Sequence, residues 1–409
     1  MHLAHLRLRD FRNYARLDVD FAPGFHVLLG DNAQGKTNIL EAVYLMATLR
    51  SFRGVGSAQM IRHGQKGYFV GGKVIGGTIQ AVRTSFPLST TGGEGRGEEA
   101  KAAPAQNPSP QPSPRLSGER ETGILTSYGD REIKMYWSTA ERSLSLDGRP
   151  VKKLTDYLGA LRTVVFCTED LQLVKGTARI RRRFLDLLLT QTHPTYLPLL
   201  QRYAQALRSR NALLKRHAPD EAALESFTHE LVETGGEIIR LRRELIPKIS
   251  PLTRLAYRRI SNDAEELRME YLPSVKSDFG VELAQARRRE LSYRATLVGP
   301  HRDDLQLLQN DRSAAQFGSE GQKRTLAIAL KMAQAEYLTG LHGSPPVLLI
   351  DDVMGELDEK RRRGLLPLLE RSHQARGQVF MTCTEENWPR ELGRELQRWE
   401  VKSGALNGV

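Results

Sequence analysis

Cysteine is nearly absent from this sequence, which has only Cys167 and Cys383 among its 409 residues. Two cysteines alone make neither a disulfide framework nor a zinc site, so we expect two reduced thiols. Long apolar segments are also lacking, and no run approaches the 18 residues of a membrane span. The N-terminus carries an Arg or His every few residues, unlike a secretory signal. We therefore expect a cytoplasmic protein with no membrane segment.

Acidic residues are in the minority. Lys and Arg number 60, Asp and Glu number 48, and the net charge is +12. A basic balance favours a polyanionic partner without naming one. The hydrophobic share of 40% and the charged share of 26% are ordinary for globular proteins, which excludes disorder of the whole chain. The length predicts two or three domains, or one large domain with an insertion.

One internal segment lacks the means to fold. Residues 91–122 hold five Pro, five Gly and a single large apolar residue, Leu116. Such a segment cannot offset the entropy lost on ordering, so we predict a disordered loop between two β-rich stretches, residues 65–90 and 123–150.

The remaining patterns indicate a divided α/β protein. Near-alternation of apolar residues predicts strands in the first 30 residues. Residues 178–269 are helical in character, with interruptions at several prolines, and strand-like patterning returns near Leu291. We predict an α/β head, lobe I, formed by residues 1–165 and 291–409. A mainly helical insertion, lobe II, would comprise residues 166–290.

The most specific motif is a phosphate-binding loop that follows a short apolar strand and opens an amphipathic helix. Its glycines let main-chain N–H groups point at phosphates, its lysine reaches the β- and γ-phosphates, and its threonine hydroxyl offers a ligand to Mg²⁺. The sequence therefore predicts binding of ATP with Mg²⁺. The motif residues are Gly30, Asp31, Asn32, Ala33, Gln34, Gly35, Lys36 and Thr37.

A second apolar strand, residues 347–350, ends in Asp351 and Asp352. We predict that Asp351 holds Mg²⁺ and that Asp352 orients the attacking water, which makes Asp352 and Lys36 the candidate catalytic residues. The alternative interpretation is a pair of solvated turn aspartates.

Ser319, Glu320, Gly321 and Gln322 precede another predicted helix. The simpler interpretation of Ser319 is a helix N-cap. The sharper interpretation is an ABC-type signature, whose serine, glycine N–H and helix dipole reach a partner protomer's γ-phosphate. The order of signature, helix, apolar strand and Asp-Asp favours the second interpretation.

Basic residues concentrate in the predicted helical lobe. Residues 178–216 contain nine Lys or Arg and one acidic residue, and residues 240–259 contain seven and one. One interpretation is solvated helix faces and arginines paired in the core. The functional interpretation is a sequence-independent DNA-backbone surface. Tyr196 and Tyr203 are expected to pack in the core, with base stacking as the alternative. The candidate DNA-binding residues are Arg181, Arg182, Arg183, Arg208, Arg210, Lys215 and Arg216.

Taken together, these motifs resemble those of the RecF family of bacterial recombinational-repair ATPases, which are related to SMC-type ABC ATPases. The resemblance rests on residues 8–14, 30–38, 41–44, 169–176, 181–186, 299–304, 319–324 and 356–358. It adds Arg12, Asn13 and Asn38 to the candidate nucleotide-binding residues. It implies an ATP-dependent homodimer, slow DNA-dependent ATP hydrolysis and binding at single-strand/double-strand junctions or gaps. It also implies work with RecR and RecO to load RecA, and a part in SOS induction.

Some positions depart from ABC ATPase patterns. Asp352 stands where a catalytic glutamate is usual, so we expect slow turnover. Thr382 and Cys383 follow the last core strand where transporters have a histidine, which leaves the γ-phosphate sensor unassigned. Arg302 either contacts a phosphate or pairs with its neighbouring aspartates. A nucleotide-binding platform with negligible hydrolysis is the main alternative function. A transporter ATPase subunit is disfavoured by the basic lobe and by SEGQ in place of LSGGQ.

Overall fold

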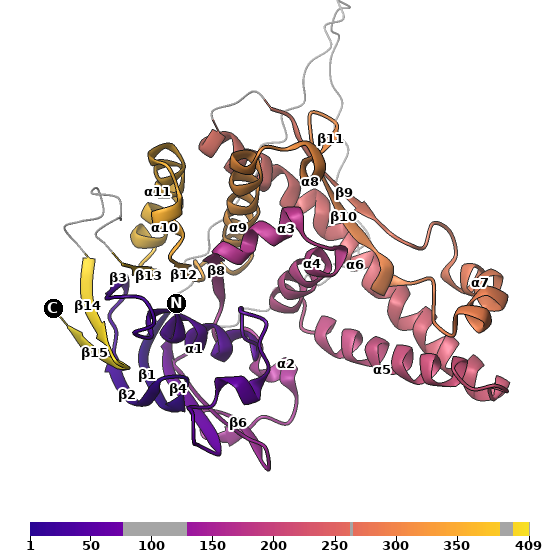
Figure 1. The fold of residues 1–409 in the computed structure, drawn as a ribbon, viewed down its shortest axis with the longest axis horizontal. Coiled ribbons are helices and arrows are strands. Elements are labelled where there is room, and N and C mark those ends of the chain that lie inside the picture. The colour runs from indigo at the N-terminus through magenta and orange to yellow at the C-terminus, as the bar shows by residue number, and fades with distance from the viewer. Residues whose placement is uncertain (77–128, 262–264, 385–395, 409) are drawn as a thin grey trace, which may run out of the picture.

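The N-terminal part of the chain forms an antiparallel sheet. The computed structural model describes residues 1–76, 129–261, 265–384 and 396–408 (Figure 1). The six strands lie in the order β2-β1-β4-β5-β6-β7. Alternating apolar residues of β1, such as Leu6 and Leu8, are fully buried, as their period of two predicts. The strands are β1 (His2–Phe11), β2 (Tyr14–Asp20), β4 (Gly67–Ile75), β5 (Arg131–Ser138), β6 (Arg142–Leu146) and β7 (Arg149–Pro150).

A second six-stranded sheet has a parallel centre and carries the phosphate loop. Its order is β15-β14-β3-β13-β12-β8, and only the β14–β15 pair is antiparallel. The central strand β12 is apolar at four successive positions because helices or strands cover both of its faces. The strands are β3 (Gly24–Leu29), β8 (Thr163–Cys167), β12 (Val347–Asp351), β13 (Gln378–Cys383), β14 (Leu396–Lys402) and β15 (Ala405–Gly408).

Helix α1 (Lys36–Thr48) lies between the two sheets. Its residues Ile39, Leu40 and Val43 are fully buried and share one core with strands of both sheets. The parallel sheet carries a second core on its other face, which includes α9 (Glu320–His342) and α11 (Glu359–Gln374). The predicted α/β fold is confirmed, and the strand-to-helix transition at the phosphate loop lies at the carboxyl edge of the parallel strands.

The predicted helical region forms α4 (Ala178–Thr192), α5 (Tyr196–Leu214) and α6 (Glu221–Ser261). The expected interruptions at Pro247 and Pro251 are wrong, because α6 runs through both prolines for 41 residues. Both prolines lie on the exposed face, where water can hydrate the carbonyls that lose their N–H partners. Tyr196 and Tyr203 are buried, as expected for packing residues.

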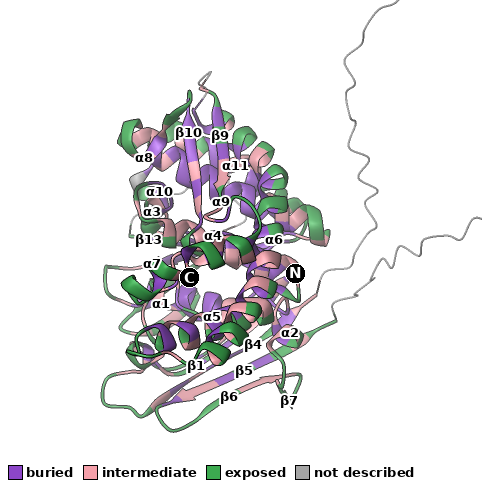
Figure 2. Ribbon diagram, turned by 90° about the vertical axis from the view of Figure 1, so that its right-hand side faces the viewer, coloured by how far each residue is buried: buried purple, intermediate pink, exposed green. Residues whose placement is uncertain are grey.

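The strand predicted near Leu291 is also wrong. Residues Phe279–Tyr293 form helix α7, with Asp278 as its N-cap. The strands of this region are β9 (Leu267–Leu272) and β10 (Asp304–Gln309), which pair with each other beside the short β11 (Arg312–Ser313). This small sheet crosses the predicted boundary at residue 290, and one continuous core joins α4, α5 and α6 to α9. Figure 2 shows buried residues along β9 and β10 and exposed residues on the outer helix surfaces.

Short elements complete the described chain. Residues 91–122, predicted to be disordered, lie outside the described residues. In the described part, no helix has both the length and the apolar character needed to cross a bilayer. The short elements are η1 (Ser57–Met60), α2 (Leu154–Tyr157), η2 (Thr168–Leu171), α3 (Gln172–Lys175), η3 (Pro300–Arg302), α8 (Ala314–Phe317) and α10 (Val353–Glu356).

Candidate nucleotide-binding site

The phosphate loop connects β3 to α1 in a conformation that only its glycines allow easily. Gly30 has a φ of 145° and Gly35 a φ of 116°, both in the region that side chains avoid. A Cβ atom on Gly35 would lie 2.6 Å from the side chain of Asn13, and one on Gly30 would overlap the carbonyl oxygen of Val401. These two positions therefore need glycine for both conformation and space.

The β1–β2 turn and the β14–β15 turn hold this loop from two sides. Asn13 donates from Nδ2 to the carbonyl of Gln34 at 2.7 Å and accepts from Asn38 Nδ2 at 2.8 Å. The main-chain N–H of Ser403 donates to Gln34 Oε1 at 2.7 Å. Asn13 and Asn38 thus contact the loop or each other, while Ser403 belongs to a C-terminal turn that no sequence motif indicated.

Lys36 and the two aspartates lie at the start of α1 and the end of β12. Lys36 Nζ donates to the carbonyls of Gly30 at 2.5 Å and Asp31 at 2.9 Å. Burial lowers the pKa of Lys36, and the negative charges of Asp352 and Asp31 partly oppose that shift. The ammonium group therefore lies inside the curl of the loop, where the motif requires a cation for phosphates.

Thr37 and Asp351 meet although 314 positions separate them in sequence. Thr37 Oγ1 donates to Asp351 Oδ1 at 2.8 Å, and Thr382 Oγ1 donates to the same oxygen at 2.9 Å. Burial raises the pKa of Asp351, and the two hydroxyl donors oppose that rise. A hydroxyl and a carboxylate converge here, which is the hard-oxygen donor set that suits Mg²⁺ beside phosphates.

Asp352 turns into the cleft through an unusual backbone conformation. Its φ is 54°, and its N–H donates to Thr382 Oγ1 at 2.9 Å. Asp352 and Thr382 both line a cleft of about 480 Å³ together with the phosphate loop. The solvated-turn interpretation of the aspartates therefore does not fit, because Asp352 lines the cleft with Lys36 and Thr37, and Asp351 is bonded to Thr37.

Arg12 lines the same cleft, but its guanidinium already has partners. Nε and Nη2 donate to the two carboxylate oxygens of Glu41, each at 2.7 Å, and Nη1 donates to the carbonyl of Gln59. Glu41 is fully buried and also accepts from Ser51 Oγ at 2.5 Å. Sequence reasoning missed three further residues that line the cleft, Arg53, Gln59 and Ile61, because no motif or period marks them.

The signature segment begins α9 and fits both of its interpretations. Ser319 caps the helix by accepting from the N–H of Gln322 at 3.2 Å, and Gln322 reciprocates through its side chain. A Cβ on Gly321 would lie 2.5 Å from Arg361 Nη2 of α11, so glycine gives close packing at this helix start. Glu320 accepts from Lys175 Nζ at 3.0 Å. Residues 319–322 are not among the described residues that line the phosphate-loop cleft.

Six of the seven candidate DNA-binding residues divide into two groups. Arg181 donates twice to the carboxylate of Asp304, Arg182 donates to the carbonyl of Asp303, and Arg183 donates to the carbonyl of Ser51. Arg208, Lys215 and Arg216 are exposed at the end of α5, and we find no ion pair for them among the described residues.

Arg210 belongs to neither group, and its predicted DNA contact needs correction. Its side chain is 1% exposed and donates to Glu290 Oε2 at 2.6 Å, with further bonds to Thr228 and Thr296. A side chain this buried cannot reach a DNA phosphate. Arg302 was expected to contact a phosphate or to pair with its neighbouring aspartates. Its Nη2 instead lies 3.4 Å from the carbonyl oxygen of Thr296.

Relatives match nearly the whole chain. A RecF DNA replication and repair protein of Symbiobacterium thermophilum is 34% identical over 99% of this chain and 98% of its own length. One from Thermosynechococcus vestitus is 37% identical over 94% of this chain and 91% of its own length. The chain belongs to the RecF family. The AAA domain family also matches, at residues 5–139.

Solved structures agree with this RecF assignment. The recombination mediator RecF with ATP, described as part of the RecFOR pathway, has a TM-score of 0.80 at 27% identity, covering 100% of this chain and 97% of that chain. An Smc head domain derived from Pyrococcus furiosus covers 100% of this chain and 96% of that chain, with a TM-score of 0.52 at 15% identity. The Smc likeness concerns the fold alone. The RecF family resemblance inferred from sequence motifs is therefore confirmed.

Proposed function

We propose that this protein is an ATP-dependent DNA-binding protein of replication and recombinational repair. The observation that carries the proposal is the hydrogen bond of Thr37 with Asp351 at the cleft that Lys36, Thr37 and Asp352 line. Phosphate-binding main chain, a lysine and a carboxylate at a strand end are the recurring parts of ATP sites. The RecF structure with bound ATP supports the same ligand.

Each residue of the cleft has its own role in ATP binding or hydrolysis. Lys36 and the loop N–H groups bind phosphate oxygens, and Thr37 and Asp351 hold Mg²⁺, which would neutralise charge on those phosphates. Asp352 accepts a hydrogen bond from the attacking water and positions it. Thr382 fixes both aspartates through its hydroxyl, which makes it a positioning residue. Because Asp352 has a shorter side chain than a glutamate, we expect slow turnover.

The site would be completed by a second protomer. Ser319 to Gln322 form a capped helix start whose N–H groups and dipole favour an anion. In the protomer described here, these residues do not line the phosphate-loop cleft. We propose that ATP joins Gly30–Thr37 of one protomer to Ser319–Gln322 of the other, forming a switch-like dimer.

DNA would bind to the exposed basic end of α5. Arg208, Lys215 and Arg216 offer charge without a competing carboxylate partner among the described residues, and backbone phosphates need no base-specific readout. We propose that the dimer closes on single-stranded DNA and on gapped or junction duplexes. It would act with RecR and RecO to load RecA and so support SOS induction.

One experiment tests dimerisation, DNA linkage and hydrolysis together. Light scattering would give the mass with ATP and Mg²⁺, with and without gapped DNA, and phosphate release would be measured on the same samples. For the native chain, we expect ATP to double the mass and DNA to raise the rate of ATP hydrolysis. We expect neither effect for Lys36→Arg. Equal phosphate release from both proteins would refute the enzymatic part and leave a nucleotide-binding platform. A mass that stays monomeric would refute the dimer.

A further inference from the structure

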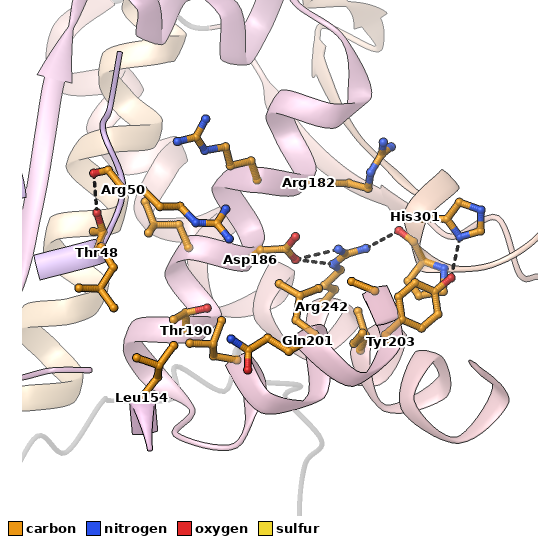
Figure 3. A pocket seen from close by; sticks show the side chains of 18 of the residues that line it. Thr48, Arg50, Leu154, Arg182, Asp186, Thr190, Gln201, Tyr203, Arg242 and His301 are labelled. Carbon is orange, nitrogen blue, oxygen red and sulfur yellow. Dashed lines mark hydrogen bonds and ion pairs between the residues drawn. The ribbon is translucent and has the colours of Figure 1, made fainter. Parts of the chain in front are cut away.

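A cavity lies between lobe I and the helical lobe, away from the phosphate loop. Its volume is about 630 Å³, within the range of sites that hold a small ligand. The end of α1 and α2 supply one wall, and α4, α5 and α6 supply the others. In Figure 3, Arg50 extends from the end of α1 toward Asp186 of α4, while Gln201 and Tyr203 enter from α5.

Four arginines that line this cavity have no carboxylate partner in the described residues: Arg50, Arg179, Arg182 and Arg183. Arg182 and Arg183 donate only to main-chain carbonyls, and neither Arg50 nor Arg179 makes a side-chain hydrogen bond or ion pair there. Arg50, Arg179 and Arg183 are exposed, so water solvates them until an anion joins them. Burial and the positive charge of Arg242 lower the pKa of Arg182, while the nearby carboxylates of Asp303, Asp304 and Asp186 oppose that shift.

The one acidic side chain that lines the cavity is already neutralised. Asp186 Oδ1 accepts from Arg242 Nη2 at 2.7 Å and from the hydroxyl of Tyr196 at 2.5 Å. Arg242 is itself shared with Asp303 at 3.2 Å. His301 adds no charge near neutral pH, because burial lowers its pKa to about 4. The four unpaired arginines therefore set the electrostatic character of the cavity.

Beside polar residues such as Thr48, Thr190 and Gln201, the lining has an apolar wall. Leu197, Leu200, Ala204 and Leu207 of α5 lie along one wall, and Ile238 of α6 joins them. An inorganic anion would use only the arginines and leave this apolar wall without a partner. A nucleotide unit fits both features, since its phosphate pairs with guanidinium groups while its base packs on apolar side chains.

We propose that this interlobe cavity binds a single nucleotide unit of a single-stranded nucleic acid, separately from the ATP cleft. The proposal rests on the proposed DNA-binding function and makes it more specific, because it places one nucleotide of the strand in a defined cavity. The same chemistry could come from a free mononucleotide, and the test separates these two sources.

The test uses the full chain with saturating ATP and Mg²⁺, so that the ATP cleft is filled. Binding of a fluorescent oligothymidylate is measured by anisotropy over a series of salt concentrations. Arg50→Ala/Arg179→Ala should weaken binding about tenfold or more, because each charge-assisted contact is lost. It should also lower the slope of log K against log salt by about 0.7, the value for one neutralised phosphate of a single strand. The charge-matched control is Arg254→Ala/Arg258→Ala on the exposed face of α6, away from the cavity lining.

A second variant fills the cavity without changing its charge. Ala204→Trp should weaken oligothymidylate binding about tenfold while gapped-duplex binding and thermal stability remain. Competition by dTMP, but not by inorganic phosphate, would identify a site that also accepts free nucleotides. No competition by dTMP, together with the Ala204→Trp loss, would identify a strand-only site.

Two results would overturn the inference. An equal loss of oligothymidylate affinity in Arg50→Ala/Arg179→Ala and in Arg254→Ala/Arg258→Ala would show that only the total positive charge matters. Native affinity of Ala204→Trp for oligothymidylate would show that the cavity stays outside the complex. Either result leaves the proposed function standing if the native protein still binds gapped DNA and doubles its mass with ATP. Failure of the native protein in those two assays would refute the proposed function itself.

Discussion

Arg208 and Arg210 lie two positions apart on α5 and should respond to mutation in opposite ways. Arg210 is 1% exposed and Glu290 is 0% exposed, and Nη2 and Oε2 lie 2.6 Å apart. Glu290 also accepts from the N–H of Leu297 at 2.8 Å. Arg210→Met would leave this buried carboxylate with one main-chain donor. Removing one partner of a buried pair costs about 3–5 kcal/mol of unfolding free energy.

Removing both charges should cost far less. Replacement of a buried ion pair by apolar residues of similar volume is often neutral or stabilising, so Arg210→Met/Glu290→Met should recover most of the loss. Arg208→Ala, on the exposed face, should change stability by less than about 0.5 kcal/mol. It should instead lower the salt slope of duplex binding by about 0.9 for one lost phosphate contact.

Urea unfolding followed by circular dichroism measures the stability of the four proteins, and anisotropy at several salt concentrations measures DNA binding. The decisive comparison is between the two single variants on the same helix. If Arg210→Met kept native stability but lost DNA affinity, the inference that Arg210 is a buried structural residue would be refuted. If the double variant were no more stable than Arg210→Met, an unpaired charge would not explain the loss.

Three further outcomes are expected. Thr382→Val should lower ATP turnover about 10- to 100-fold and raise the Mg²⁺ requirement, because both aspartates lose a hydroxyl partner; Thr382→Ser should restore both in a phosphate-release assay. Gly35→Ala should abolish binding of a fluorescent ATP analogue, whereas Gly24→Ala, with a similar φ of 113° but open space around it, should only reduce thermal stability. Burial lowers the pKa of His26 and of His301 to about 4, so the unfolded chain binds more protons between pH 6.5 and 4. Stability measured by urea unfolding should therefore fall as pH decreases through that window, and His26→Gln should make the fall smaller.

The phosphate loop and the aspartate pair were predictable because each is a local pattern with one chemical use. Residues 30–37 define their own conformation through glycine, and an apolar run ending in Asp-Asp indicates a buried strand. The contact between Thr37 and Asp351 follows from parallel strands that place their carboxyl ends at one edge. Thr382 was recognised as a departure from pattern, but its hydrogen bonds depend on the β12–β13 register.

The errors along the helical region have a different physical origin. Pro247 and Pro251 carry a strong local signal for a break, yet the apolar stripe that includes Leu245 and Ile249 continues past them. Packing of that stripe outweighs two lost N–H groups that face solvent. The strand expected near Leu291 failed because α7 is short, half-exposed and rich in arginine, so its apolar period was weak.

The charge count did not predict which arginines are available to DNA, because it does not include the acidic residues from distant parts of the chain that pair with them. Asp186, Glu290, Asp303 and Asp304 neutralise arginines up to 123 positions away. Each such pair joins two segments: Arg181 links α4 to the start of β10, Arg210 links α5 to α7, and Arg242 links α6 to α4 and to Asp303. The charge left for a polyanion is therefore smaller than the formal value, and part of it lies at the exposed end of α5 and in the arginine-lined cavity between the lobes. Because no single surface carries the whole excess, contacts at these two places should contribute separately to the salt dependence of binding.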